Sequence, residues 1–156
     1  PALPATTLTE ACYLGMFYSC DKLVNAPTLP AETLEASCYS QMFDLCTSLK
    51  TAPALPATNL ASNCYYAMFM GCTSLETAPA LPATTLASTC YKQMFMGCTK
   101  LSNITMLATD ISATDCLKNW VSNVAVSGTF IKASSMTTLP ENSTSGIPTG
   151  WTVVNQ

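Results

Sequence analysis

The chain has 156 residues, of which 49% are hydrophobic and only 10% are charged, so one core is expected and much of the solubility must come from Ser, Thr and Asn. The net charge is −3 and the six basic residues are scattered lysines, which excludes a basic surface for nucleic acid. No apolar run approaches the roughly 18 residues that a membrane helix needs.

A 26-residue repeat runs through the chain and is its main signal. Prolines, leucines and Met-Phe pairs keep this spacing, and it lies within the 20–29 residues of leucine-rich repeats. Because the first unit starts inside the pattern, we expect a fragment whose repeats extend further toward the N-terminus. All nine cysteines fall in two columns: Cys12, Cys38, Cys64, Cys90 and Cys116, and Cys20, Cys46, Cys72 and Cys98.

Each unit is predicted to contain one short helix. In the third unit the apolar residues from Leu60 to Cys72 are spaced four, four, one and three, which places them on one stripe of a helix. Asn59 precedes the stripe and can cap a helix N-terminus, and Gly71 suits a left-handed C-terminal cap. We therefore expect four helices side by side and a fifth over residues 113–124.

The other half of each unit is predicted to be extended. It holds two prolines, which cannot donate to a sheet ladder, so the paired strand should be very short, around Leu75 to Ala78 in the third unit. A polyproline-like segment with Pro79 and Pro82 would then turn onto the next helix. Stacked neighbours would build one continuous core.

The C-terminal part departs from the repeat. Ile111 stands one residue early relative to Leu86, which predicts a local slip in the fifth unit. After Val124 the register is lost, and short strands are expected at 129–132 and at 151–154. This segment would cover the exposed end of the last unit, with Trp151 over the core.

The predicted fold class is therefore α/β. A leucine-rich-repeat solenoid of about five units, the first one truncated, would occupy residues 1–125. It would carry short parallel strands on one face and short helices on the other. A small β C-terminal cap would occupy residues 126–156.

The repeat residues resemble a known family. The run from Ala78 to Leu86, followed by Cys90-Tyr91 and by Met-Phe-Met-Gly-Cys-Thr at residues 94–99, is similar to BspA-like leucine-rich repeats. The resemblance covers residues 1–104 closely, and the tail resembles the ending of such arrays, including some in phage-like genes. It implies a protein of anaerobic gut or oral bacteria with an extracellular or cell-surface location and an adhesive or ligand-binding role. It supplies no catalytic motif.

The cysteines are expected to be reduced, buried thiols. Zinc sites use close cysteine pairs, often with histidine, whereas the spacings here are eight and eighteen and histidine is absent. A nucleophilic thiol would lack a histidine base. A disulfide between Cys64 and Cys72 cannot form on a helix, because eight residues rise roughly 12 Å. Disulfides between neighbouring units remain an alternative.

No set of residues predicts catalysis. Glu32 with Glu35, or Asp110 with Asp115, could act as an acid–base pair, but solvated faces or helix ends explain them better. The sequence has no glycine-rich phosphate loop and no Ser/His/Asp set. We therefore expect a protein that is not an enzyme and uses no cofactor or metal.

Positions that vary between units supply the candidate ligand face. On the strand side they include Lys50 and Glu76, the only charges of their column, in adjacent units. A tyrosine column could form a platform for sugars or a partner, or it could pack beside the core with its hydroxyls at the surface. The candidate residues are Lys50, Glu76, Ser102, Tyr39 and Tyr65.

These observations predict a non-enzymatic, surface-exposed binding or adhesion module that recognises a protein or glycan through the repeat face. The alternatives are a phage structural or receptor-binding component and a passive spacer. We expect a monomer with no nucleic-acid partner and no membrane-spanning segment.

Overall fold

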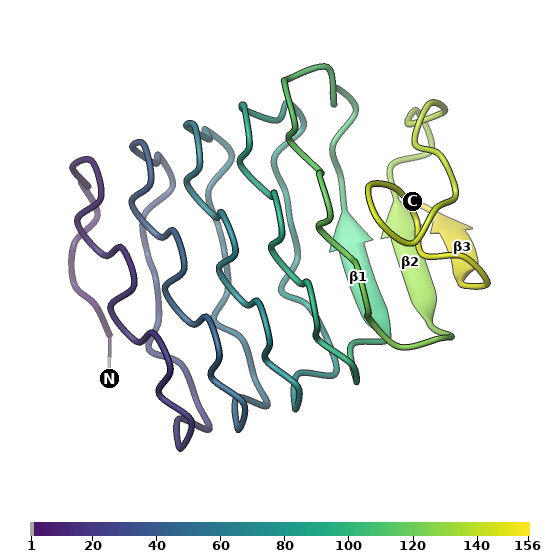
Figure 1. Cartoon of the computed structure of the whole chain (residues 1–156). Helices are drawn as coiled ribbons and strands as arrows, with labels where there is room; N and C mark the ends of the chain where they lie inside the picture. Colours follow the sequence, from purple (N-terminus) through teal and green to yellow (C-terminus); the bar gives the residue numbers. More distant parts are fainter. Residues whose placement is uncertain (1) are drawn as a thin grey trace.

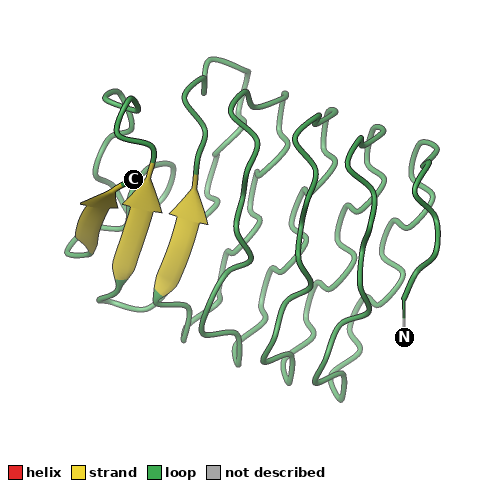
Figure 2. Ribbon diagram, turned by 180° about the vertical axis from the view of Figure 1, so that it is seen from behind, coloured by secondary structure: helices red, strands yellow, loops and turns green. Residues whose placement is uncertain are grey.

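The computed structural model describes residues 2–156, and this part of the chain contains no helix. The chain winds into a stack of coils, one for each 26-residue repeat, that runs from the N-terminus to the C-terminal strands (Figure 1). Each coil has an extended segment and a turn segment, which lie on opposite sides of the stack (Figure 2). The turn segments are residues 9–20, 35–46, 61–72, 87–98 and 113–124.

Two alternating sets of hydrogen bonds build the turn segments. Every second residue donates its N–H to the carbonyl three residues earlier, as Cys12 does to Thr9. The residues between them donate to the next coil, as Phe17 does to Met42 at 2.9 Å. Five such bonds of 2.7–3.1 Å join each pair of neighbouring turn segments. Backbone bonds between coils therefore hold this side of the stack together.

Left-handed backbone conformations recur at every fourth residue of the turn segments. In the first of them Ala11, Gly15 and Ser19 have φ between 55° and 60°, and the matching positions are left-handed in the other four. An α-helix has no left-handed residues and bonds each N–H to the carbonyl four residues earlier. The predicted helices are therefore wrong, and so is the α/β leucine-rich-repeat solenoid that depends on them.

The period of the apolar pattern explains this error. Leu60, Cys64, Met68 and Cys72 are spaced by four, which is close to the 3.6 residues per turn of a helix. Two consecutive turns also bring the chain back to the same side after four residues, so they present the same side chains to the core. Gly, Asn or Asp fills seven of the fifteen left-handed positions, a composition typical of turns.

Within the described residues, three short parallel strands form one sheet in the order β1-β2-β3 (Figure 1). They are β1 (Asn103–Met106), β2 (Thr129–Lys132) and β3 (Thr152–Asn155). β2 has the bounds expected from the sequence, and β3 begins one residue later than expected. The two strands that follow the predicted boundary at residue 126 thus continue the sheet that β1 begins.

Prolines decide where the sheet starts. The strand predicted around Leu75 to Ala78 is only an isolated bridge, between Thr77 and Asn103. Extended segments before β1 carry prolines such as Pro79 and Pro82, which have no N–H to donate. The fifth coil has no proline at these positions, and there β1 pairs along four residues with β2.

The predicted slip in the fifth unit is confirmed. Thr77 pairs with Asn103, one full repeat later, whereas Thr85 pairs with Asp110, one residue short of a full repeat. The register of the other coils is restored by Cys116, whose carbonyl accepts the N–H of Tyr91 at 3.0 Å.

Identical side chains stack in columns through the core. Phe43, Phe69 and Phe95 are fully buried, with nearly parallel rings whose centroids are 5.6 and 5.7 Å apart. Trp120 ends the column, 6.2 Å from Phe95 and 6.0 Å from Phe130. Each interior ring is therefore packed between the coil before it and the coil after it.

Candidate functional site

A row of exposed Thr and Asn side chains crosses the extended side of the stack. Backbone pairing sets Asn25 opposite Thr51, and it aligns Thr77, Asn103, Thr129 and Thr152 in turn; the 26-residue repeat places Thr51 and Thr77 in the same column. We call this set the polar row: Asn25, Thr51, Thr77, Asn103, Thr129 and Thr152. All six are exposed except Thr129, which is partly buried.

The alternation of an extended chain directs this row to solvent. Ala78 and Ile104 are buried, so the residues just before them, Thr77 and Asn103, point outward. Paired strands lie about 4.8 Å apart, which sets the spacing of the row. Each member offers a hydroxyl or an amide that both donates and accepts hydrogen bonds. The sequence did not predict this row, because its residues vary little between units and a ligand was expected at variable positions.

Three of the predicted ligand residues lie beside the polar row. Lys50 and Glu76 are exposed and Ser102 is half-buried, each one residue before a member of the row. The backbone keeps their column in register, since Ser102 donates its N–H to the carbonyl of Glu76 at 3.0 Å. Between residues 2 and 156 no ion pair joins Lys50 to Glu76. Both charges are therefore open to a ligand.

The other two predicted ligand residues do not belong to this surface. Tyr39 and Tyr65 are each only 1% exposed, and their rings stack with centroids 6.0 Å apart. Burial raises the pKa of both phenols. The structure thus places these side chains in the core, and it buries the hydroxyls that the sequence placed at the surface.

Burial also settles the chemistry of the cysteines. It raises the pKa of Cys38 and Cys46 to about 11 and that of Cys98 to about 12, so these thiols stay protonated. Cys46 donates its thiol to the carbonyl of Phe17 at 3.1 Å, and Cys98 donates to Phe69 at 3.0 Å. A protonated thiol is not the nucleophilic form. These cysteines fill the core and add a weak bond between coils.

All nine cysteines are unpaired in the structure, seven of them buried. The absence of a Cys64–Cys72 bridge matches the prediction, but the helical distance that supported it is wrong. Only Cys12 and Cys20 are exposed.

We expect a thiol reagent to label two cysteines in the native protein and all nine after denaturation without reductant. Counting the labels by mass spectrometry checks this, and peptide mapping should assign the native pair to Cys12 and Cys20. Fewer than nine labels in the denatured protein would mean that disulfides form in solution.

A shallow hollow of about 390 Å³ opens between the first two coils. It contains Glu32 and Glu35, one of the carboxylate pairs considered above, together with Thr6, Thr7 and Thr33. Both carboxylates are exposed, and neither contacts a base or a buried nucleophile. The hollow has no arrangement for acid–base catalysis.

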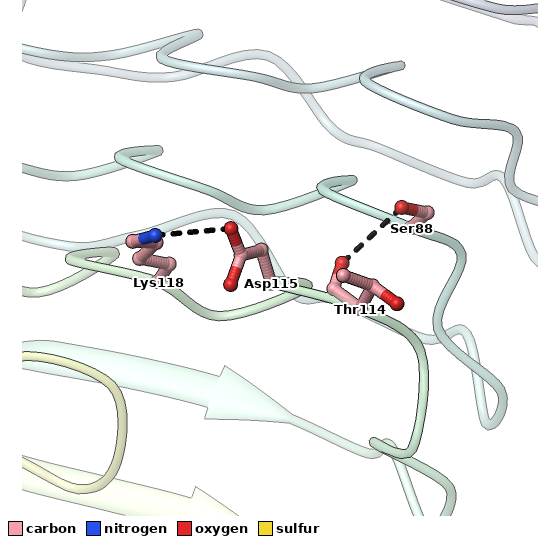
Figure 3. A network of polar contacts seen from close by, with 4 residues as sticks. All are labelled: Ser88, Thr114, Asp115 and Lys118. Atoms are coloured by element: carbon pink, nitrogen blue, oxygen red, sulfur yellow. Dashed lines mark hydrogen bonds and ion pairs between the residues drawn. The ribbon is translucent and has the colours of Figure 1, made fainter.

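The two members of the second carboxylate pair, Asp110 and Asp115, bind different partners. Asp115 binds Lys118 at 3.1 Å, close to the bond that Ser88 donates to the carbonyl of Thr114 (Figure 3). Asp110 accepts the N–H of Ser112 at 3.0 Å, and this hydrogen bonding lowers the pKa of Asp110. Both carboxylates therefore keep structural contacts.

Residues 2–156 contain no group of three or more His, Cys, Asp or Glu side chains placed to hold a metal ion. The same residues include no helix with the length and apolarity to cross a bilayer.

Among the side-chain carboxylates of residues 2–156, only that of Asp44 is buried. It is 1% exposed, its Oδ1 atom has no hydrogen-bond partner, and Gln41 donates to its other oxygen at 3.5 Å. Loss of hydration raises its pKa above the ordinary value of 3.8. Because the folded pKa exceeds the unfolded one, the fold favours the protonated acid. Stability from this group is present below pH 3.8 and is lost as the pH rises through the folded value.

We therefore expect Asp44→Asn to stabilise the protein at pH 7, because the neutral amide has the same shape but carries no charge into the core; each unit by which burial raises the pKa of Asp44 corresponds to about 1.4 kcal/mol. The gain should disappear at pH 3. Urea unfolding from pH 3 to pH 7 measures this, with the exposed Asp21→Asn as the control. A constant difference across that range would show that ionisation of Asp44 does not limit stability.

Comparison of the chain with family models, with curated proteins and with solved structures finds no match in any of the three. The resemblance to BspA-like repeats therefore rests on the quoted residues alone. The leucine-rich-repeat architecture that it implies is overturned by the helix-free coils, and neither the fold nor the comparisons support an adhesion role.

Proposed function

We propose that the protein is a non-enzymatic binding module that recognises a glycan or a protein through its extended side. The polar row carries this proposal, because six successive extended segments hold hydroxyl or amide groups in one column, and all but Thr129 are exposed. A regular line of this kind suits a ligand that repeats along its length. Lys50 and Glu76 lie beside the row and would fix the orientation of that ligand.

A glycan suits this surface better than a protein does. Protein interfaces are centred on Trp, Tyr and Arg anchors, but the chain has no Arg. Tyr39, Tyr65 and Tyr91 stack in the core, and Tyr18 and Tyr66 belong to the turn segments on the other side of the stack (Figure 2). Neutral hydroxyl and amide groups are instead the partners that sugar hydroxyls require. We keep an extracellular location as part of this proposal, since burial protects seven of the nine thiols from oxidants.

A glycan array followed by titration of the best ligand tests the proposal. Thr51→Val with Thr77→Val should weaken binding about 5- to 150-fold, because each lost hydrogen bond contributes about 0.5–1.5 kcal/mol. Valine keeps the branched shape, so the stack should stay folded. Lys50→Ala with Glu76→Ala should also weaken binding if the charges orient the ligand.

The matched control is Thr99→Val, an exposed threonine just beyond a turn segment. It should leave affinity unchanged. Equal affinity in the control and in the Thr51/Thr77 variant would remove the polar row from the binding site. A screen of glycans and proteins that yields no ligand would favour the passive spacer.

A further inference from the structure

A band of small apolar side chains lies next to the polar row on the extended side of the stack. Leu55 and Ala57 are buried in the core, so Pro56 between them points outward and is exposed. The same alternation repeats in the neighbouring coils. We call the outward residues the apolar band: Pro30, Ala54, Pro56, Ala80, Pro82 and Leu107. Pro82 and Leu107 are half-buried, and the others are exposed.

Threonines border the apolar band on the side away from the polar row. Thr58 and Thr84 are exposed beyond the prolines of their coils, and Thr109 holds the matching place in the fifth coil. Backbone bonds between coils align this column, since Thr109 donates its N–H to the carbonyl of Thr84 at 2.8 Å. We call Thr58, Thr84 and Thr109 the second polar row. The extended side thus presents an apolar band between two rows of hydroxyl or amide groups.

The width of this surface is set within one coil and does not depend on the number of coils. Thr51 of the polar row and Thr58 lie on one extended segment, up to roughly 22 Å apart if each residue advances the chain by about 3.1 Å. Neighbouring segments stay side by side over this length, because pairing joins Thr51 to Asn25 at one end and Asn59 to Thr33 at the other (Figure 2). The surface is therefore several times wider than a single sugar ring.

The surface has the chemistry that the flat side of a neutral polysaccharide requires. A pyranose ring in an equatorially linked chain shows C–H groups on its two faces and hydroxyls at its edges. Proline rings and alanine methyls remove such C–H faces from water, and threonines exchange hydrogen bonds with the hydroxyls. The side chains of the band are short and uncharged, so a flat ligand can approach closely. Glu32 and Glu76 border the surface and the net charge is −3, which disfavours a polyanion.

We propose that the extended side binds the flat surface of a packed neutral polysaccharide, in which equatorially linked chains lie side by side. This inference rests on the glycan binding proposed above and names the physical form of the glycan. A single dissolved chain would cover either the apolar band or one polar row, whereas a packed surface covers all of them at once. Simultaneous contact along several rows raises affinity without a change in any single contact.

Depletion of the protein from solution by insoluble particles tests the proposal. The particles are microcrystalline cellulose and chitin, and the matching hexasaccharides serve as dissolved ligands. We expect at least one kind of particle to bind the protein. At equal sugar concentration the matching hexasaccharide should bind at least about tenfold less protein, because it cannot cover all the rows at once.

A pair of lysines on the apolar band should remove this binding. Ala54→Lys with Ala80→Lys should lower particle binding at least about tenfold, because two long charged side chains hold a flat ligand away from the surface. The matched control, Ser48→Lys with Ser74→Lys, adds the same charge outside the band. Its column already contains a lysine in the fourth coil, Lys100, so the fold accepts the change. The control should bind the particles as the parent protein does.

Thr58→Val with Thr84→Val supplies a second variant that keeps the branched side-chain shape. It should also weaken particle binding, because the second polar row loses hydroxyls that bond to the ligand. Unchanged particle binding in this variant would show that the contact does not extend across the full width of the extended side, and so would contradict the proposal.

The remaining outcomes separate this inference from the proposed function. Particle binding by Ala54→Lys with Ala80→Lys that equals that of the parent would overturn the inference, and so would a hexasaccharide that binds as strongly as the particles. In either case a loss of binding in Thr51→Val with Thr77→Val would leave the polar row as a glycan site. Binding of no glycan in any form would reject the proposed glycan recognition together with this inference.

Discussion

Replacing Phe69 by Ala is expected to cost about 3–5 kcal/mol of unfolding free energy, as for other fully buried phenylalanines. Phe69 is 0% exposed and lies between Phe43 and Phe95, at 5.6 and 5.7 Å. The two neighbouring coils cannot close the gap without breaking the backbone bonds that set their spacing. Urea unfolding of the variant and the parent protein measures the loss.

The chain offers a matched control for this change in Phe17→Ala. Phe17 occupies the same column, but it is only partly buried and stacks on one side alone. Its replacement should cost less than half as much as that of Phe69. Equal losses at the two positions would show that the column does not stabilise the stack by two-sided packing.

Gly128→Ala is expected to destabilise the protein by about 3 kcal/mol, at the upper end of typical overpacking costs. A β-carbon at Gly128 would lie 2.3 Å from the carbonyl oxygen of Ser102 and 2.8 Å from its carbonyl carbon. Both atoms are backbone, so no side-chain rotation can relieve the clash. The same carbonyl accepts the N–H of Thr129 at 2.8 Å, at the start of the β1–β2 pairing.

Thermal unfolding and hydrogen exchange together check this effect. Protection in β2 and β3 should fall before protection in the turn segments does. Ser127→Ala is the control, because this exposed neighbour adds no atom against Ser102. A Gly128→Ala protein with the parent's stability would mean that the backbone of β1 shifts freely.

The repeat, the slip at Ile111 and the strand at 129–132 could all be predicted from the sequence. The repeat and the slip follow from the spacing of matching residues, and the strand follows from its β-branched and aromatic residues. Both signals can be read directly from the sequence. The turn segments could not be predicted, because apolar spacing by four fits a helix and a series of turns almost equally well. Turn segments with a left-handed residue at every fourth position differ from helices in backbone conformation and in their hydrogen bonds to the next coil, and neither difference changes the apolar spacing.

The same difference between a helix and a turn segment explains why Tyr39 and Tyr65 were expected at the ligand face but lie in the core. On a helix, Tyr65 would lie about 100° around the axis from Cys64 and reach the edge of the stripe. In the turn segment two consecutive residues face inward together, so Cys64 with Tyr65, and Met68 with Phe69, are all buried. The polar row could not be predicted, because its Thr and Asn residues vary little between units and their alignment depends on the pairing of coils.

The repeated columns have a consequence for how the chain reaches its native register. Coils two, three and four present nearly the same side chains to one another. A coil could therefore pair with the coil after its correct neighbour, keep most of its contacts and leave one whole unit looped out. Repeat proteins are prone to such misassembly. The fifth coil differs, because its pairing with the fourth coil is one residue short of a repeat and because Trp120 bonds to Gly146 in the segment that follows. Folding that begins at the C-terminal strands would therefore fix the alignment of every earlier coil, whereas folding that begins in the middle would have to search among equivalent partners.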